Sequence, residues 1–321
     1  MQYFIYKYHQ LLYFSLKIHI FVKRFCLEMR ILYNKDKWLD IYKSAKYESI
    51  RKQILETFNG LVFIEEGHKY FLNGKEMECV SNVAHMFQEH IDTVKLATET
   101  HERNFNKPTS KYYQMTVDDI IASWQKISSD ACSHGTERHE FGESAFYYMV
   151  GEYDKILPEF KDRLTDDGGF LAIHPKEEAV VKFYEEIPQC IVPILAETRV
   201  YVEYDRAGYA GTFDILFYYD AELIGKPLET SGLMILDWKT NKDLYKNFRE
   251  QKLLTPFEHL LDMPLSTYKL QLSLYENALY KIGLKVVGRR ILWLKPDGTY
   301  EKINLESYRE KIDNELKKLY N

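Results

Sequence analysis

The sequence predicts a mixed α/β (α+β) fold in which helices flank a central β-sheet. Downstream of Pro193, a helix of period 3.6 is expected at about 266–282, followed by a strand at 286–295. Before that helix, three runs rich in β-branched and aromatic residues are separated by turn signals. These runs cover residues 194–204, 209–219 and 233–240. The order helix, three strands, helix, strand is typical of a sheet with helices packed on it.

The part of the chain before this core is expected to contain a β-hairpin and several helices. Residues 60–80 alternate apolar and polar side chains, and their Asn73-Gly74 dipeptide is favoured in tight hairpin turns. A long helix is expected from about Val117 to Met149, because apolar residues recur there at helical spacing. Shorter helices are expected at 176–187 and from about Leu305 onward. We therefore divide the chain into an N-terminal extension, a hairpin and helical region, and a main domain, with boundaries 1–28, 29–116 and 117–321.

Residues 1–28 are rich in Tyr, Phe, Leu and Ile and carry a positive excess, since the first thirty residues hold five Lys and Arg against Glu28 alone. No charge-free run approaches the ~20 apolar residues that a membrane-spanning helix needs. A clean apolar core with a small-residue cleavage site, typical of a secretory signal, is not evident either. Two interpretations stay open: an extension upstream of a start at Met29, or an amphipathic helix packed on the main domain.

The overall charge argues against a protein that holds nucleic acid by bulk positive charge. Lys and Arg together number 43 and Asp and Glu 48, so the formal net charge is −5. A locally basic groove remains compatible with that balance. Apolar residues make up 45% of the 321 residues and charged residues 28%, a composition that predicts an ordered, soluble protein without a membrane anchor.

The cysteines are scattered and predict neither a zinc ribbon nor an iron–sulfur cluster. No Cys-x-x-Cys pair occurs, and about fifty residues separate each cysteine from the next. Scattered thiols fit the reducing cytoplasm, so a cytoplasmic location is expected. The four residues are Cys26, Cys79, Cys132 and Cys190.

Two aspartates and a lysine stand out on the predicted strands. Strand periodicity places Asp237 and Lys239 on one face, while Trp238 points the other way. Asp214, on the preceding strand, can lie beside Asp237 and form a two-carboxylate site for a hard cation such as Mg²⁺. Lys239 would then hold the attacking water or help to deprotonate it. A salt bridge within a buried strand pair explains the same tripeptide without any chemistry, and both readings stay open.

Further polar residues lie on elements that could reach this pair. Glu197 on the strand before Asp214 could bind a metal directly or through water, or could be a solvated strand residue. Gly135 and His139 lie four apart on one helical face, which would let the helix approach closely where the histidine points. Gln271 and Tyr275 are also four apart and share a face of the later helix. Each residue alone has an ordinary structural explanation.

Taken together and in this order, these elements resemble the PD-(D/E)XK nuclease superfamily, most closely its RecB-like, phage-type exonuclease branch. The resemblance covers about residues 120–300, and five motifs occur in register. They are GTERH at 135–139, Glu197, GTFD at 211–214, DWK at 237–239 and QLSLY at 271–275. One departure is the long separation of Asp214 from Asp237, for which residues 220–232 are expected to form an extended hairpin.

The resemblance implies a restriction-endonuclease-like core and metal-dependent hydrolysis of phosphodiester bonds, with one or two Mg²⁺ or Mn²⁺ ions. It makes Lys239 the water-positioning lysine and gives Gln271 and Tyr275 the task of placing Lys239 and the DNA backbone. The implied metal ligands are His139, Asp214, Asp237, the backbone carbonyl of Trp238 and, in the first or second shell of the metal, Glu197. The cysteine quartet of the iron–sulfur subset is absent from this sequence, as is a G-x-x-x-x-G-K-[ST] helicase motif.

Two clusters of basic residues adjoin the predicted site and are candidates for contacting DNA phosphates. The first follows the strand that ends at Lys239, and the second lies on the strand at 286–295. The candidates are Lys242, Lys246, Arg249, Lys252, Arg289 and Arg290. Tyr245, Phe248 and Phe257 lie near the first cluster and could stack on unpaired bases or pack in the core.

We therefore expect a metal-dependent DNA exonuclease that acts in phage-type recombination, repair or replication, in the bacterial host cytoplasm if the protein is of phage origin. Its expected partners are linear duplex or single-stranded DNA ends and a single-strand annealing or recombination protein, with a homo-oligomer as a further expectation. Two alternatives stay open: a structure-specific or site-specific endonuclease of the same fold, and a non-catalytic DNA-binding or assembly protein with a residual nuclease core. Digestion of linear or circular DNA separates the three.

Overall fold

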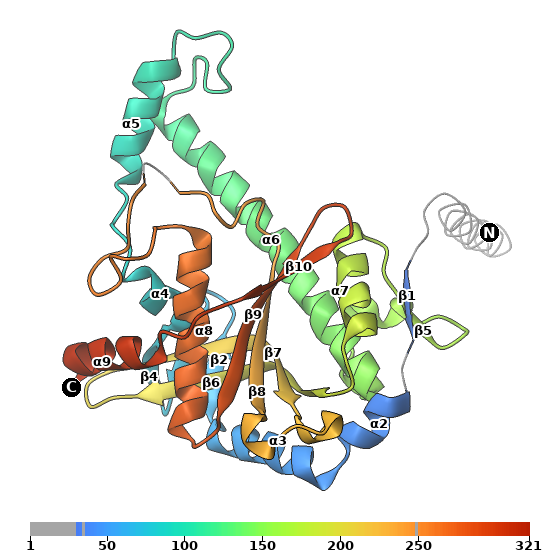
Figure 1. Cartoon of the computed structure of the whole chain (residues 1–321). Helices are drawn as coiled ribbons and strands as arrows, with labels where there is room; N and C mark the ends of the chain where they lie inside the picture. The colour runs from blue at the N-terminus through green and yellow to red at the C-terminus, as the bar shows by residue number, and fades with distance from the viewer. Residues whose placement is uncertain (1–29, 34–35, 248–249) are drawn as a thin grey trace, which may run out of the picture.

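The computed structural model describes residues 30–33, 36–247 and 250–321, so the predicted extension at 1–28 lies outside the described part. The predicted fold class is confirmed, because helices flank one mixed sheet of eight strands (Figure 1). The strands of this sheet are β2 (Leu61–Ile64), β3 (Lys69–Leu72), β4 (Lys75–Cys79), β6 (Ile191–Glu203), β7 (Gly208–Tyr219), β8 (Gly232–Lys239), β9 (Val286–Leu294) and β10 (Tyr300–Asn304).

Antiparallel and parallel pairings both occur in this sheet. The strand order is β10-β9-β8-β7-β4-β3-β2, and β6 pairs with β7 alongside this path. The β8–β9 and β4–β7 pairs are parallel, while β6–β7 and β7–β8 are antiparallel. Strands β1 (Ile31–Tyr33) and β5 (Gly169–Leu171) form a separate antiparallel pair. Strand β4 joins the main sheet through β7, and the division of the chain at 116/117 stays a prediction.

Helices pack on both faces of the main sheet. Helices α6 (Val117–Val150) and α7 (Pro175–Glu186) cover one face, where Trp238 of β8 packs against Phe183 and Tyr184 of α7. Helix α8 (Pro264–Lys281) covers the other face, where Tyr275 packs against Phe213 of β7. The described helices are α2 (Asp36–Tyr42), α3 (Ala45–Thr57), α4 (Val80–His85), α5 (Thr93–Asn104), α6 (Val117–Val150), α7 (Pro175–Glu186), α8 (Pro264–Lys281) and α9 (Arg309–Tyr320).

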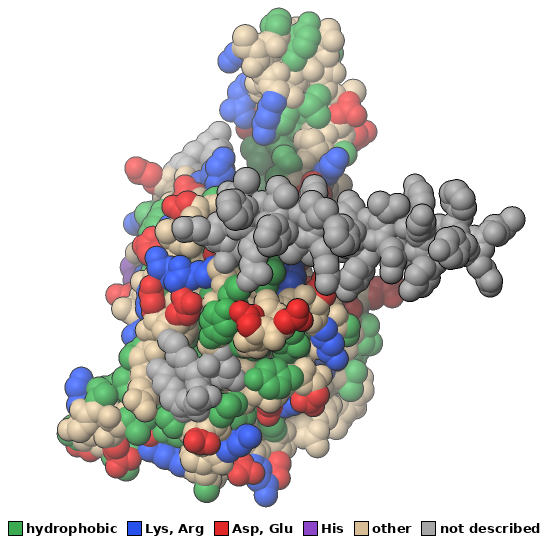
Figure 2. Space-filling model, turned by 90° about the vertical axis from the view of Figure 1, so that its right-hand side faces the viewer, with side chains coloured by type: hydrophobic (Ala, Val, Ile, Leu, Met, Phe, Trp, Pro, Cys, Tyr) green, Lys and Arg blue, Asp and Glu red, His purple; other side chains and the backbone are tan. Residues whose placement is uncertain are grey.

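Helix α6 begins and ends where its sequence contains capping residues. Thr116 and Asp119 form a capping box, in which each side chain accepts a hydrogen bond from the other residue's backbone N–H. Gly151 ends the helix at φ 77°, a left-handed conformation that glycine adopts without strain. The first half of α6 packs with α5 into an arm that stands clear of the sheet (Figures 1 and 2). Within the described ranges, no helix combines the length and apolarity needed to cross a bilayer.

Two loop predictions have different outcomes. Asn73 and Gly74 form the two-residue turn between β3 and β4 with φ values of 52° and 79°, as the dipeptide predicted. The extended hairpin expected at 220–232 is wrong, because this segment folds into two 3-10 turns, η3 (Glu222–Ile224) and η4 (Leu228–Thr230). Gly225 turns the chain between them at φ 69°, and Pro227 has no N–H to donate to a strand ladder.

Close packing of α6 on the sheet depends on Gly142. A Cβ atom built there would lie 2.5 Å from Trp238 Nε1, closer than two such atoms approach in folded proteins. The expectation that Gly135 provides the close approach is wrong, because its Cβ would meet only Thr240 Oγ1, at an ordinary 3.7 Å. Spacing along a helix identifies a shared face, whereas the distance from that face to the sheet depends on how the helix is tilted.

We predict that Gly142→Ala lowers the free energy of unfolding by about 1–3 kcal/mol, the usual cost of forcing an extra carbon into a packed interior. The measurement is urea unfolding followed by circular dichroism. Gly135→Ala is the matched control on the same helix. It should leave stability unchanged or raise it by up to about 1 kcal/mol, because alanine is the better helix former. Equal effects of the two substitutions would contradict this packing argument.

Candidate metal centre

Three acidic residues lie at the same level on three neighbouring strands. The pairs Ala196–Ile215 and Thr198–Phe213 bracket Glu197 on β6 and Asp214 on β7. The β7–β8 ladder ends at the pair Ile215–Leu236, and the next residues on those two strands are Asp214 and Asp237. The sheet register therefore places the three acidic residues in a row across β6, β7 and β8.

Strands β7 and β8 stop pairing at this row. The Asp214 side chain then accepts a hydrogen bond from a β8 backbone N–H that has no partner on β7. The backbone N–H of Trp238 donates a hydrogen bond to Asp214 Oδ2 at 2.7 Å. Because this bond is buried, it fixes the Asp214 carboxylate at the point where the ladder opens. The indole of Trp238 packs against α6 at Gly142, and the predicted metal contact of its carbonyl remains untested.

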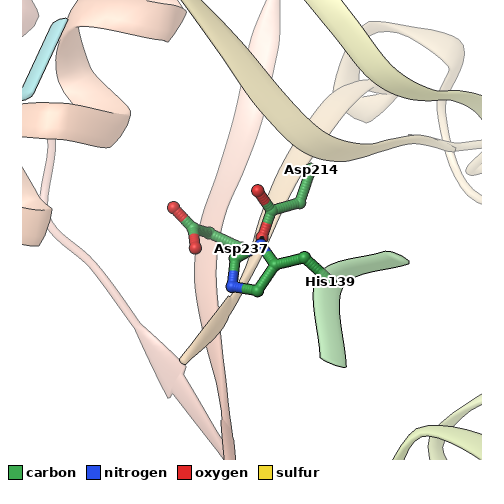
Figure 3. Close-up of side chains that lie close together, drawn as sticks. All are labelled: His139, Asp214 and Asp237. Atoms are coloured by element: carbon green, nitrogen blue, oxygen red, sulfur yellow. Dashed lines mark ion pairs between the residues drawn. The ribbon is translucent and has the colours of Figure 1, made fainter. Parts of the chain in front are cut away.

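His139 reaches the aspartates from helix α6. Its Nδ1 lies 3.1 Å from Asp214 Oδ2, and one ligand atom from each of His139, Asp214 and Asp237 lies within 4.8 Å of the others (Figure 3). Burial lowers the pKa of His139, but the charge of Asp214 and its hydrogen bond outweigh burial and raise the pKa overall. A nitrogen and two carboxylates that converge from a helix and two strands form a candidate metal site.

Asp214 and Asp237 have different proton affinities. Burial raises the pKa of Asp237 to about 7, and the neighbouring Asp214 charge adds to this effect. Burial also acts on Asp214, but the charge and hydrogen bond of His139 outweigh it and lower the pKa of Asp214. Asp214 is therefore the carboxylate that ionises more readily, whereas Asp237 holds a proton more tightly than an ordinary aspartate.

Lys239 lies against Asp237 and against a ring from helix α8. Its Nζ is 2.5 Å from Asp237 Oδ1 and 4.4 Å from the centre of the Tyr268 ring. Burial lowers the pKa of Lys239, but the charge of Asp237 outweighs burial, so the pKa is raised and the amine stays an ammonium. An ammonium donates hydrogen bonds and accepts none. Of the two roles expected for Lys239, holding a water is therefore favoured over removing its proton.

Glu197 is near the three metal-ligand candidates but is not one of the residues whose ligand atoms lie within 4.8 Å. Its backbone has a φ of 42° in the middle of β6, a left-handed conformation that is costly for a residue with a side chain. Burial raises the pKa of Glu197 well above its usual range, and the charges of Asp214 and Glu143 add to this effect. An additional uncompensated negative charge would therefore be unfavourable here, which fits a position beside a cation.

Three residues near the site were not identified from the sequence. Glu143 follows His139 by one helical turn, and burial raises its pKa to about 7. The i, i+4 spacing from His139 was the available signal. Tyr268 precedes Gln271 by three residues on α8 and could have been found as the next position on that face. Glu177, buried on α7, forms an ion pair with Arg138 and so fastens α6 at the residue before His139, a contact without a local sequence signal.

Gln271 and Tyr275 lie on helix α8 and contact each other. The Gln271 amide donates a hydrogen bond to the Tyr275 hydroxyl at 3.4 Å, and the Tyr275 ring packs on Phe213. Among the described contacts of Lys239, the α8 side chain is Tyr268 rather than either of these two. Their predicted roles in placing Lys239 and DNA stay predictions.

The predicted DNA-contacting residues fall into separate groups. Lys242, Lys246 and Lys252 are exposed in the segment after β8, while Arg249 and its neighbour Phe248 lie outside the described residues. Arg289 points toward α8, where its guanidinium lies 3.0 Å from a Glu276 oxygen, so its charge is already compensated. Arg290 lines a cavity of about 610 Å³ together with Arg289, and none of the three metal-ligand candidates is among the lining residues of that cavity. Acidic and basic side chains are interspersed on the surface seen in Figure 2.

Comparisons with known proteins add little to this geometry. No protein-family model matches the chain, and no curated protein sequence matches it. Among solved structures, it is similar to a protein from Eubacterium rectale that is provisionally named an exonuclease, at 13% identity and a TM-score of 0.34. The match covers 56% of this chain and 62% of that one, so this chain spans less than two thirds of that protein. A likeness this weak carries no argument about function, which must rest on the site.

We predict that Mn²⁺ binds the chain and that Asp214→Asn and Asp237→Asn each remove most of the affinity, because each substitution replaces an anionic ligand by a neutral amide. Isothermal titration calorimetry on the full chain measures this. Asp205→Asn, an exposed position in the turn between β6 and β7, is the matched control and should bind like the unaltered chain. Unchanged affinity in both site variants would refute the assignment.

We further predict that Mn²⁺ affinity falls as the pH drops below about 7. Asp237, with a pKa of about 7, must lose its proton to bind a cation, and so must His139, whose pKa is raised. Protons therefore compete with the metal at low pH, and each displaced proton weakens binding about tenfold per pH unit. Titrations between pH 6 and 8 that show one constant affinity would contradict this.

Proposed function

We propose that this protein is a metal-dependent deoxyribonuclease of the PD-(D/E)XK superfamily that hydrolyses phosphodiester bonds. The observation that carries the proposal is the convergence of His139, Asp214 and Asp237 from three elements, with the Lys239 ammonium against Asp237. These residues come from three of the five motifs that the resemblance names. A buried salt bridge alone explains Asp237 and Lys239, but it gives no reason for His139 and Asp214 to join them.

The side chains present fit a divalent cation. Carboxylate oxygens are ligands that Mg²⁺ and Mn²⁺ prefer, and an imidazole nitrogen completes the set. The row of carboxylates is costly as it stands, since burial raises the pKa of both Asp237 and Glu197. When bound, Mg²⁺ or Mn²⁺ would neutralise the charge that develops on the phosphate oxygens during hydrolysis.

The remaining chemistry follows from the chain's own groups. The Trp238 N–H holds the Asp214 carboxylate in place, and Asp237 holds the Lys239 ammonium. The ring of Tyr268 lies against the same ammonium and limits where it can move. Lys239 would then donate hydrogen bonds to a water or a phosphate oxygen and keep the attacking oxygen in line with the leaving group.

We propose exonuclease rather than endonuclease activity because the motif order resembles the RecB-like, phage-type branch. The same resemblance supports a role in DNA recombination, repair or replication beside a single-strand annealing or recombination protein. Oligomeric assembly and a cytoplasmic site of action belong to this proposal. End-labelled linear DNA and covalently closed circles, each with Mg²⁺ or Mn²⁺, test it directly. Degradation of linear DNA alone supports an exonuclease, cutting of circles supports an endonuclease, and no cutting of either contradicts the proposed activity.

We predict that Lys239→Ala lowers the rate of DNA cleavage at least about 100-fold, the usual loss when a positioned hydrogen-bond donor is removed from an active site. Folding should persist, because Lys239 lies at the end of its strand. Cleavage of labelled linear DNA under single-turnover conditions measures the rate. Lys226→Ala is the matched control, since Lys226 is an exposed lysine in the β7–β8 connection, at the other end of β8. Full activity of the Lys239 variant would refute the mechanism.

A further inference from the structure

An aromatic cluster lies beside Lys239 at the edge of the site. Trp293 on β9 is the register partner of Lys239 on the parallel strand β8, so the two residues are neighbours across the strands. Asn241 joins this pair to helix α8. Its backbone oxygen accepts a hydrogen bond from Trp293 Nε1 at 2.7 Å, and its side-chain oxygen accepts one from the Tyr268 hydroxyl at 2.9 Å.

Tyr245 extends this cluster to the surface. Its ring centre lies 6.1 Å from that of Trp293 at an interplanar angle of 66°, so Trp293 supports it edge-on. Its backbone N–H donates a hydrogen bond to Asp243 Oδ1 at 2.8 Å, which orders the turn that carries the ring. Even so, 49% of Tyr245 remains exposed. A ring that only completes the core would be covered, as Phe257 is, with no exposed surface at all.

Positive charge flanks the exposed ring. Lys242 and Lys246 are exposed on either side of Tyr245 in the chain, and neither lies within ion-pair distance of a carboxylate in the described ranges. Lys295, directly after β9, lies over the Trp293 ring and is paired with Glu301 at 3.1 Å, so the free ammonium groups here are those of Lys242 and Lys246. The surface therefore combines an aromatic face with free ammonium groups, and both features serve to bind a strand whose bases are unstacked.

We infer that Tyr245, supported by Trp293, is a stacking platform for an unpaired base of a DNA strand, with Lys242 and Lys246 binding the adjacent phosphates. The inference rests on the proposed function and narrows its substrate, because the strand that reaches Lys239 is then single-stranded or locally unpaired. Bases inside a duplex already stack on each other and cannot use such a ring. Bases in a free strand expose a face that an aromatic side chain can cover.

The test is binding of DNA to the full chain in EDTA, where no cleavage interferes. Fluorescence anisotropy follows a labelled oligothymidylate and a blunt duplex with G·C ends. Tyr245→Ala should weaken binding of the single strand about 5- to 100-fold, the range for loss of one stacked base, and leave duplex binding nearly unchanged. Tyr245→Phe keeps the ring and should bind the single strand within about twofold of the unaltered chain.

Tyr280→Ala is the matched control. Tyr280 is 56% exposed near the end of α8 that lies away from Tyr268, and Arg309 lies over its ring. It should leave both affinities unchanged. Equal single-strand affinity in Tyr245→Ala and the unaltered chain would overturn the platform, as would an equal loss for duplex and single strand, or an equal loss in Tyr280→Ala.

Tryptophan fluorescence gives an independent readout. Stacking next to Trp293 should quench its emission when oligothymidylate is added, and Trp293→Phe should remove that part of the quenching. Trp38→Phe, which alters a tryptophan buried on α2, should retain it. Quenching that is identical in Trp293→Phe and the unaltered chain would count against the platform.

The platform and the nuclease proposal can fail separately. If the chain cleaves linear DNA but binds single strands independently of Tyr245, the nuclease proposal stands and the platform is refuted. If the chain binds single strands through Tyr245 but cleaves no DNA with Mg²⁺ or Mn²⁺, the platform stands and the nuclease proposal is refuted.

Discussion

The structure of the site depends on one hydrogen bond, from the backbone N–H of Trp238 to the carboxylate of Asp214. At this point β7 and β8 stop pairing, and without another partner the N–H would be buried and unsatisfied, at a cost of about 1–3 kcal/mol. The carboxylate provides that partner and is thereby fixed beside Asp237. His139 approaches Asp214 because Gly142 lets helix α6 lie close to the Trp238 indole. Trp238 therefore takes part in both arrangements: its backbone N–H binds Asp214 where the strands separate, and its indole contacts helix α6 at Gly142.

The same opening concentrates negative charge in a buried place. Pairing with His139 lowers the pKa of Asp214. The negative charge of Asp214 then adds to the effect of burial and raises the pKa values of Asp237 and Glu197. Lys239 compensates only part of this charge, and Glu197 also has a left-handed backbone within a strand. A fold that retains several such costs in one place is expected to gain something there. A divalent cation is the group that would remove most of the electrostatic cost.

Sequence reasoning succeeded where the determining interactions are local. The turn at Asn73-Gly74 and the long helix at α6 were predicted from short-range chemistry, and the alternation along β8 correctly put Asp237 and Lys239 on one face. It failed where a contact depends on the distance between elements that are far apart in the sequence. Gly135 shares a face with His139, but a Cβ there would meet only Thr240 at an ordinary distance, and Arg289 belongs to a basic cluster yet is already paired with Glu276. The roles of Trp293 and Tyr268 beside Lys239 arise from β8–β9 register and α8 packing, which no short window of sequence contains.

The sequence by itself determined the fold class, the order of the elements and the residue types available for chemistry, because periodicity, turn dipeptides and helix caps act over a few residues. Only the tertiary structure decided which of those side chains meet. It brought His139 to Asp214 and excluded Phe257 from the surface while leaving Tyr245 exposed on Trp293. It also set the proton affinities, since these depend on burial and on charges that are distant in the chain. Strand register and helix tilt are properties of the whole packed sheet, and they turn a set of motifs into a site.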